Sequence, residues 1–304
     1  HEIGHQVGAN HTFSMSTEGT GVNAEPGSGS TIMSYAGITG SNDVQPMVDP
    51  YFHYHSINQI LNNVDVQTCW TSTAIANNPP SADAGNDYVI PQGTAYVLRG
   101  SATDADSGDT LMYCWEQTDS GQVTSSGFSS TIVSGSMNRS LPPTTSPDRY
   151  IPNVNRVIAG QLTETNPTVG SDWETVATVS RTMNWALTVR DREATATGLN
   201  GQTSFDLMQI TVAGSSGPFA VTSQTTTETW DAGSTQTITW DVAGTDGGAV
   251  NTPTVNILLS ADGGLTFPFI MASDVPNDGS HDAAVPVIGG DTTMARIKVE
   301  GNNN

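Results

Sequence analysis

The spacing of apolar residues changes along the chain. In residues 1–76, two stretches have helical character, separated by a loop rich in Gly, Ser, Thr and Asn over residues 11–30. A helix is predicted to begin at Ser56, which forms an S-x-x-Q capping box with Gln59. The apolar face of this helix repeats at the helical period: Ile57, Ile60, Leu61 and Val64. A shorter helix is predicted over residues 1–9, and Gly8 is expected to end it, since glycine commonly follows a helix C-terminus.

After residues 77–80, an Asn-Asn-Pro-Pro linker, the helical period disappears. Short β-branched and aromatic runs alternate with turn residues, which is typical of a β-sandwich. The strands are predicted at 88–91, 95–99, 111–117, 183–190 and 205–212. Residues 120–180 are too long for an ordinary sandwich loop and are expected to form an ordered insertion or extra hairpins.

A second boundary falls in the Gly- and Ser-rich stretch 214–218. Beyond it, further strands are predicted at 219–223, 235–242, 254–260 and 295–300. The chain is therefore expected to divide into residues 1–76, a sandwich with a long insertion over 77–214, and a second, smaller sandwich over 215–304.

The charge excludes several classes of partner. The chain has 9 basic and 30 acidic residues, a formal net charge of -21, and Lys298 as its lone lysine. Nucleic acid and anionic membrane surfaces both require clustered basic residues. No run reaches the ~20 apolar residues that a membrane-spanning helix needs. The low lysine content and the Ser-, Thr- and Asn-rich surface indicate an exported bacterial protein.

The first eleven residues, HEIGHQVGANH, carry the chemistry. On a helix, His1 and His5 lie one turn apart on the same face. A sharp turn at Gly8 brings round His11 as a third nitrogen ligand. Three imidazoles with one open position are typical of a catalytic zinc site. Zinc acidifies a water there, and Glu2 is placed to take its proton.

The motif H-E-x-x-H-x-x-G-x-x-H, together with the methionine turn at residues 31–37, resembles the metzincin zinc metallopeptidases. Residues 50–53 and the strand 113–117 are similar to bacterial reprolysin-like peptidases, in which β-sandwich domains follow the peptidase. The resemblance implies a Zn²⁺ site and the following roles: His1, His5 and His11 as zinc ligands, Glu2 as general base and then proton donor, and Met33 as a non-ligating floor.

Tyr35 lies two places after Met33, where some metzincins carry a tyrosine that contacts the metal or stabilises the tetrahedral intermediate. A purely structural rim aromatic is the equal alternative. Because this family has an upper sub-domain before the zinc helix, we expect a fragment. The expected fold class is an α+β fragment, the C-terminal part of a metzincin catalytic domain, followed by two all-β immunoglobulin-like sandwiches.

The resulting functional prediction is a secreted or cell-surface bacterial zinc metalloendopeptidase that acts on proteins or peptides. The alternative is a non-catalytic extracellular structural or adhesive protein built on the acidic sandwiches. In both, the β-domains are candidates for contact with a cell surface or extracellular matrix. An amino-terminal copper site at His1 is a weaker alternative, because it leaves Glu2, Gly8 and His11 without a role.

Two further predictions concern metal and disulfide chemistry. Asp104, Asp106 and Asp109 alternate with small residues in a loop that could present oxygens to Ca²⁺; a solvated turn is the favoured alternative. Cys69 and Cys114 are predicted to form a disulfide, which would stabilise the fold by about 3–4 kcal/mol. Two buried thiols are the other possibility for these cysteines.

Overall fold

The computed structural model describes residues 1–69, 71, 73–192 and 200–302. The N-terminal segment (residues 1–76) is mostly loop around two helices, α1 (Glu2–Gln6) and α2 (Tyr54–Asp65), with a 3-10 turn at Gly40–Asn42. In the described part of the chain, no helix has the length and apolar character needed to cross a membrane.

Helix α2 begins at Tyr54, so the predicted start at the Ser56 capping box is wrong. The N-cap is His53, whose side chain accepts a hydrogen bond from the backbone N–H of His55. The Tyr54 N–H is bound at 2.7 Å by the carboxylate of Glu116, which lies far along the chain. These two acceptors satisfy the first orphan donors of the helix, which therefore starts two residues early.

The first sandwich has a four-stranded sheet in the order β2-β8-β7-β5, in which β2 and β8 run parallel and the other pairs antiparallel. Two short antiparallel pairs, β1-β4 and β3-β6, complete it. The strand bounds are β1 Ser81–Asp83, β2 Tyr88–Pro91, β3 Tyr96–Arg99, β4 Ser101–Thr103, β5 Thr110–Gln117, β6 Asp148–Ile151, β7 Arg181–Arg192 and β8 Thr203–Ala213.

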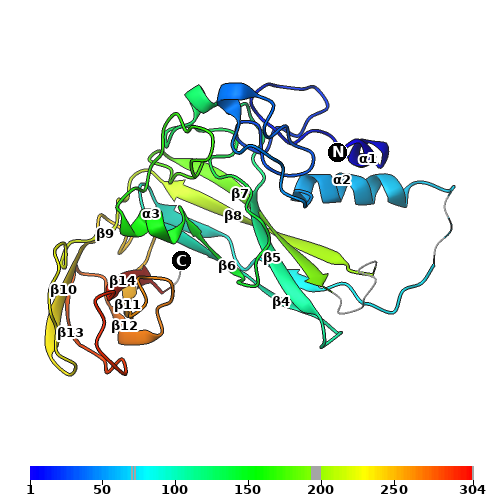
Figure 1. The fold of residues 1–304 in the computed structure, drawn as a ribbon. Helices are drawn as coiled ribbons and strands as arrows, with labels where there is room; N and C mark the ends of the chain where they lie inside the picture. The colour runs from blue at the N-terminus through cyan, green and yellow to red at the C-terminus, as the bar shows by residue number, and fades with distance from the viewer. Residues whose placement is uncertain (70, 72, 193–199, 303–304) are drawn as a thin grey trace.

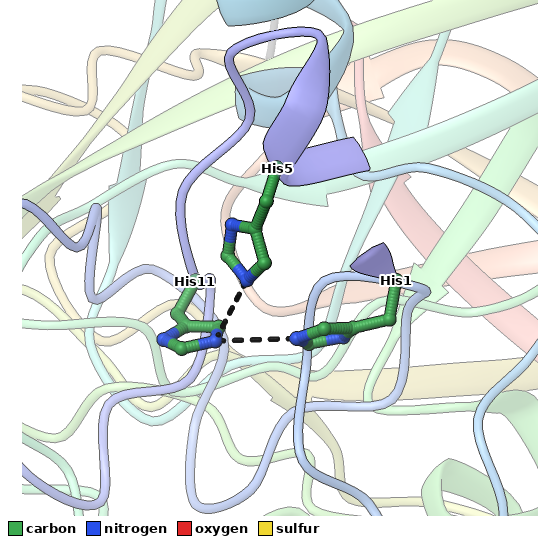
Figure 2. Close-up of side chains that lie close together, drawn as sticks. All are labelled: His1, His5 and His11. Carbon is green, nitrogen blue, oxygen red and sulfur yellow. Dashed lines mark hydrogen bonds between the residues drawn. The ribbon is translucent and has the colours of Figure 1, made fainter. Parts of the chain in front are cut away.

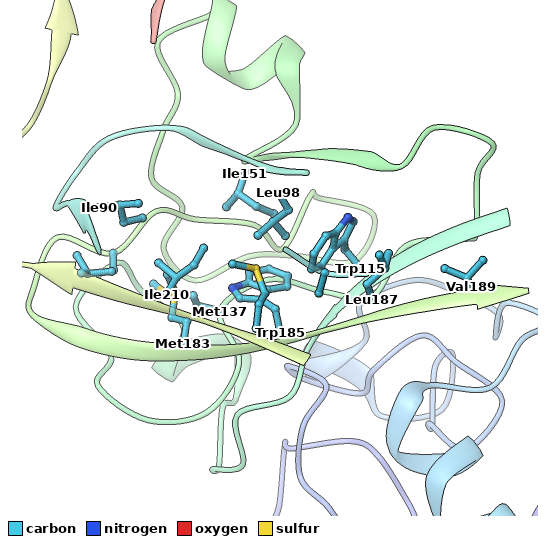
Figure 3. Packing of buried hydrophobic residues seen from close by; sticks show 14 residues of the cluster. Ile90, Leu98, Trp115, Met137, Ile151, Met183, Trp185, Leu187, Val189 and Ile210 are labelled. Carbon is cyan, nitrogen blue, oxygen red and sulfur yellow. The ribbon is translucent and has the colours of Figure 1, made fainter. Parts of the chain in front are cut away.

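The core of this sandwich follows the two-residue period of its strands. Along β7 the alternate residues Met183, Trp185, Leu187 and Val189 are all fully buried. Figure 3 shows them facing Leu98, Ile151 and Trp115 from the other strands, together in one hydrophobic cluster. Trp115 anchors strand β5 in this core, and β5 contacts the N-terminal segment through Glu116.

The second sandwich pairs two three-stranded antiparallel sheets, β13-β10-β9 and β12-β11-β14. The strand bounds are β9 Ala220–Val221, β10 Thr235–Asp241, β11 Thr254–Ser260, β12 Phe269–Pro276, β13 Ser280–Ala284 and β14 Arg296–Gly301. Its core includes Ile238, Trp240, Val255 and Ile257. The expected fold class is thus confirmed as a small helical N-terminal part followed by sandwich-like β-domains. The N-terminal segment contacts the four-stranded sheet of the first sandwich, where Arg190 of β7 donates to the Phe52 carbonyl and the Tyr54 ring meets that of Phe205 in β8. The second sandwich lies away from the N-terminal segment (Figure 1).

The inserted segment (residues 120–180) is ordered and contains a 3-10 turn at Ser125–Gly127, strand β6 and helix α3 (Val154–Ile158). Part of it lies against the N-terminal segment (Figure 1). Val44 of the N-terminal segment shares a hydrophobic cluster with Val123, Phe128 and Trp173 of the inserted segment. The two stretches therefore bury apolar surface against one another instead of meeting only through a linker.

Candidate metal centre

The three predicted ligands come together in the structure. His1 caps the start of α1, His5 lies in its last turn, and His11 follows in the loop beyond it. The Nε2 atom of His11 lies 3.1 Å from that of His5 and 3.2 Å from that of His1 (Figure 2). Nitrogens bound tetrahedrally to zinc at about 2.0–2.1 Å lie roughly 3.3 Å apart. The arrangement therefore fits a zinc ion.

The other ring nitrogen of each histidine has its own acceptor. The Nδ1–H of His1 donates to the carbonyl oxygen of Ile32, and that of His5 to the carbonyl oxygen of Ala9, both at 2.8 Å. The Nδ1–H of His11 donates to a carboxylate oxygen of Glu18 at 2.7 Å. Because these acceptors fix the proton on Nδ1, all three Nε2 atoms present lone pairs to the same point.

Glu18 is a supporting residue that the sequence did not reveal. It lies in the loop after His11, with 35% of its side chain exposed, and no motif marks it. A carboxylate that accepts from a ligating imidazole orients the ring and makes it a stronger donor to the metal. The sequence signal for Glu18 was an acidic residue in the loop that follows the third histidine. Such residues are too common for this pattern to identify a supporting carboxylate.

We expect Glu18→Ala to weaken zinc binding roughly 10- to 100-fold, the usual effect of losing such a partner. Competition with a chromophoric chelator measures the affinity. Glu18→Gln, which keeps an acceptor oxygen but not the charge, should fall between the alanine variant and the wild type. Equal affinities for all three chains would contradict a role for this carboxylate.

The turn between His5 and His11 depends on glycine. Gly8 has φ +104, and a Cβ there would lie 2.6 Å from the Cβ of Asn63 in α2. Helix α2 fixes this turn through two side chains: Asn63 Nδ2 donates to the Val7 carbonyl, and Gln59 Oε1 accepts from the Asn10 N–H, both at 2.9 Å. The second helix thus holds the backbone that carries the last two ligands.

Met33 lies beneath α1 and is fully buried. A Cβ built on Gly4 would come within 2.4 Å of its sulfur, so the helix packs directly on this side chain. The Met33 carbonyl accepts from the Thr12 N–H at 3.1 Å. Gly4, which lies between the two histidines of the helix, is a requirement that the sequence motif alone did not reveal.

The methionine turn is held from inside by a buried carboxylate. Glu25, 1% exposed, accepts hydrogen bonds from the N–H groups of Ser30 at 2.9 Å and Thr31 at 3.2 Å, and from the Thr31 hydroxyl at 2.5 Å. Hydrogen bonds to a charged acceptor are stronger than neutral ones. Glu25 therefore fixes the start of the turn that ends in Met33 and Tyr35.

The two proposed reacting side chains come from different elements, Glu2 from helix α1 and Tyr35 from the methionine turn. The Tyr35 ring is stacked on His1 at a centroid distance of 5.5 Å and meets His11 edge-on at 4.5 Å. Glu2 lies in the first turn of α1, next to His1, and its side chain is exposed. The structure thus places the Tyr35 ring against the histidines, and the catalytic roles of Glu2 and Tyr35 stay predictions.

The acidic loop before β5 also gathers its carboxylates. One oxygen from each of Asp104, Asp106 and Asp109 lies within 4.8 Å of the others. Asp106 accepts from the backbone and side-chain nitrogens of Asn78, at 2.7 and 3.0 Å, and these bonds lower its pKa. Binding of Ca²⁺ at this loop stays a prediction.

The predicted disulfide is not formed. Cys69 is exposed and free after α2, whereas Cys114 is free and buried in β5. The Cys114 thiol donates to the Leu141 carbonyl at 3.2 Å, and burial raises its pKa, so it stays a neutral thiol. Cys114 lies on the same face of β5 as Glu116, toward the N-terminal segment, whereas Cys69 lies at the surface, and the two are not bonded.

A family model described as metallo-peptidase family M12B, reprolysin-like, matches residues 1–64. No curated protein matches the chain. Among solved structures, a chimeric titin Z1Z2 functionalized with a KLER exogenous peptide from decorin is similar at 10% identity and a TM-score of 0.21, over 69% of this chain and 83% of that chain. The family match covers the histidines, the methionine turn and nearly all of α2, and supports a metallopeptidase at the level of the family.

Proposed function

We propose that the protein is a zinc-dependent endopeptidase whose reaction takes place at His1, His5 and His11. The observation that carries this proposal is the convergence of three Nε2 atoms whose Nδ1 protons are all engaged elsewhere. A closed structural zinc site would have a fourth protein ligand. Among the described residues, the cluster that could hold a metal here comprises these three histidines alone, which leaves a position for substrate.

Different residues of the chain have separate roles in the proposed reaction. Bound zinc supplies a Lewis acid that acidifies water and polarises a carbonyl group. Glu2 takes a proton from the attacking water and later returns it to the leaving amine. The Tyr35 hydroxyl donates a hydrogen bond to the carbonyl oxygen as negative charge develops on it. Met33 and Gly4 keep the helix seated, so the ligands do not shift during the reaction.

The substrates we propose are extracellular proteins or peptides in an extended conformation, and the location is secreted or cell-surface in a bacterium. The low lysine content and the many Ser, Thr and Asn residues support this location, and the net charge of -21 disfavours anionic partners. The two sandwiches would then serve as contacts to a cell surface or matrix, which the acidic composition would restrict to neutral or basic partners.

The purified chain tests the proposal directly. We expect one zinc per chain by metal analysis, none in His5→Ala, and cleavage of an unfolded protein such as reduced casein by the wild type. His281→Ala is the matched control, because that histidine lies in β13 of the second sandwich and should change neither zinc content nor cleavage. A chain without zinc would refute the metal site, and a zinc-loaded chain that cleaves nothing would favour the non-catalytic alternative.

A further inference from the structure

Strand β5 of the first sandwich places a carboxylate against the N-terminal segment. Glu116 is fully buried and accepts three hydrogen bonds. The donors are the Tyr54 N–H at 2.7 Å, the Ser140 hydroxyl at 2.7 Å and the Thr188 hydroxyl at 3.4 Å. All three neighbours donate to Glu116, and a carboxylate, which only accepts, can satisfy them together.

We propose that Glu116 is a positioning residue for the metal centre, acting through Ser140 and Tyr51 on His1 and through α2 on His5 and His11. This inference rests on the proposed function, since it concerns the same histidines. Its consequence is that the metal centre is completed by the first sandwich and is not a property of residues 1–76 alone.

The first route runs from Glu116 to His1 through four hydrogen bonds. Ser140 gives its hydroxyl proton to Glu116, so its oxygen accepts from the Tyr51 hydroxyl at 2.7 Å. Burial, with the nearby Cys114 and Glu116, raises the pKa of Tyr51 well above its usual value, which keeps this hydroxyl a donor. The Tyr51 carbonyl accepts from the Ile32 N–H at 3.0 Å, and the Ile32 carbonyl accepts from His1 Nδ1 at 2.8 Å.

A side branch of this route reaches the methionine turn. The Ser140 carbonyl accepts from the Ser30 hydroxyl at 3.2 Å. The Ser30 N–H is in turn bound by Glu25, the carboxylate that holds the turn from inside. Ser140 thus connects the inserted segment to both Tyr51 and the start of the methionine turn.

The second route runs through α2. Glu116 binds the N–H of Tyr54, the first residue of that helix, and the Gln59 and Asn63 side chains of the same helix hold the backbone at Asn10 and Val7. A helix whose N-terminal donors are left unsatisfied is destabilised. Losing Glu116 would therefore loosen the segment that positions His5 and His11.

The chemistry of the site explains why a carboxylate is used. The nearest cationic candidate is His53, whose Nε2 lies 4.0 Å from Glu116 Oε1. A buried carboxylate without a close cation is costly unless hydrogen bonds satisfy it. A residue required only for packing would not need a charge. A carboxylate is suited to this place because it can accept from three donors at once and hold each of them in position.

The test compares Glu116→Gln and Tyr51→Phe with Leu98→Ala in the full chain. Leu98 is buried in the same sandwich, at 1% exposed, and belongs to the core cluster rather than the interface, so its truncation lowers stability without touching either route. We expect a zinc affinity at least tenfold weaker in Glu116→Gln, a smaller loss in Tyr51→Phe, and a change within twofold in Leu98→Ala. The inference is overturned if Leu98→Ala weakens zinc binding as much as Glu116→Gln, or if neither interface variant weakens it.

Two readouts do not depend on zinc. The Ile32 amide should exchange with deuterium faster in Tyr51→Phe and Glu116→Gln than in Leu98→Ala, and the imidazole nitrogen shifts of His1 should move only in the two interface variants. If the wild-type chain binds no zinc, the proposed function fails while these measurements still decide the positioning role. Unchanged His1 shifts and unchanged Ile32 exchange in both interface variants would refute it.

Discussion

Glu2→Gln should lower peptide hydrolysis by about 10²- to 10⁴-fold while the chain keeps its zinc. Glu2 lies in the first turn of α1 and is exposed. The cluster that could hold the metal consists of the three histidines, so replacing Glu2 removes no ligand. Glutamine keeps the shape and the helix but cannot take a proton. General base catalysis typically contributes about 10²- to 10⁴-fold, so kcat/KM on a quenched fluorescent peptide should fall by that factor.

The control for this variant is Gln6→Ala, an exposed change four residues along the same helix. It should leave both zinc content and kcat/KM near the wild-type values. A Glu2→Gln chain that hydrolyses the peptide at a tenth of the wild-type rate or better would assign the base to another group. A chain that has lost its zinc would instead mean that Glu2 supports the ligands.

The metal centre could be predicted from the sequence because its three ligands lie close together along the chain. Helical geometry fixes the distance between His1 and His5, and a glycine turn returns the chain to His11 within eleven residues. The carboxylates that support the centre could not be predicted in this way. Glu18 and Glu116 are recognised only by the atoms they accept from, and Glu116 reaches α2 across 62 residues. Sequence periodicity contains no information about contacts of that range.

The strands show the same division between local and long-range information. The long, alternating strands β5, β7, β8, β10 and β11 were predicted to within two residues at each end, because one face of each is buried. The strands of the pairs β1-β4 and β3-β6 are only three or four residues long, and β1, β4 and β6 carry too few apolar positions to show a period. Strands β12 and β13 are mostly exposed on their outer face and were also missed.

The inserted segment illustrates why length alone is an incomplete guide. Its length predicted order, and its partner could not be predicted, because Trp173 and Phe128 look like any buried aromatics in a β-domain. The structure places them against Val44, in the loop that follows the methionine turn. The interface between the inserted segment and the N-terminal segment therefore could not be predicted from the sequence pattern. Its polar contacts, from Glu116 to Tyr51, are hydrogen bonds between residues that only the folded chain brings together.

Glu174→Ala should destabilise the first sandwich by about 3–5 kcal/mol, the usual cost of leaving a buried charge unpaired. Arg149 in β6 is 8% exposed and Glu174 is 1% exposed, and their side chains meet at 2.7 Å. The guanidinium also donates to the carbonyls of Trp115 and Arg139, so it cannot turn out to solvent when the carboxylate is removed. Chemical denaturation followed by tryptophan fluorescence measures the change.

The double variant Arg149→Met with Glu174→Leu separates charge from packing. It removes both ions and keeps two side chains of similar bulk, so it should recover most of the stability that Glu174→Ala loses. Glu174 also accepts from the Asn153 N–H at 2.8 Å, at the start of α3, and this bond is lost in both chains. If the double variant is no more stable than Glu174→Ala, the carboxylate acts mainly by capping α3; recovery would mean that it acts by neutralising Arg149.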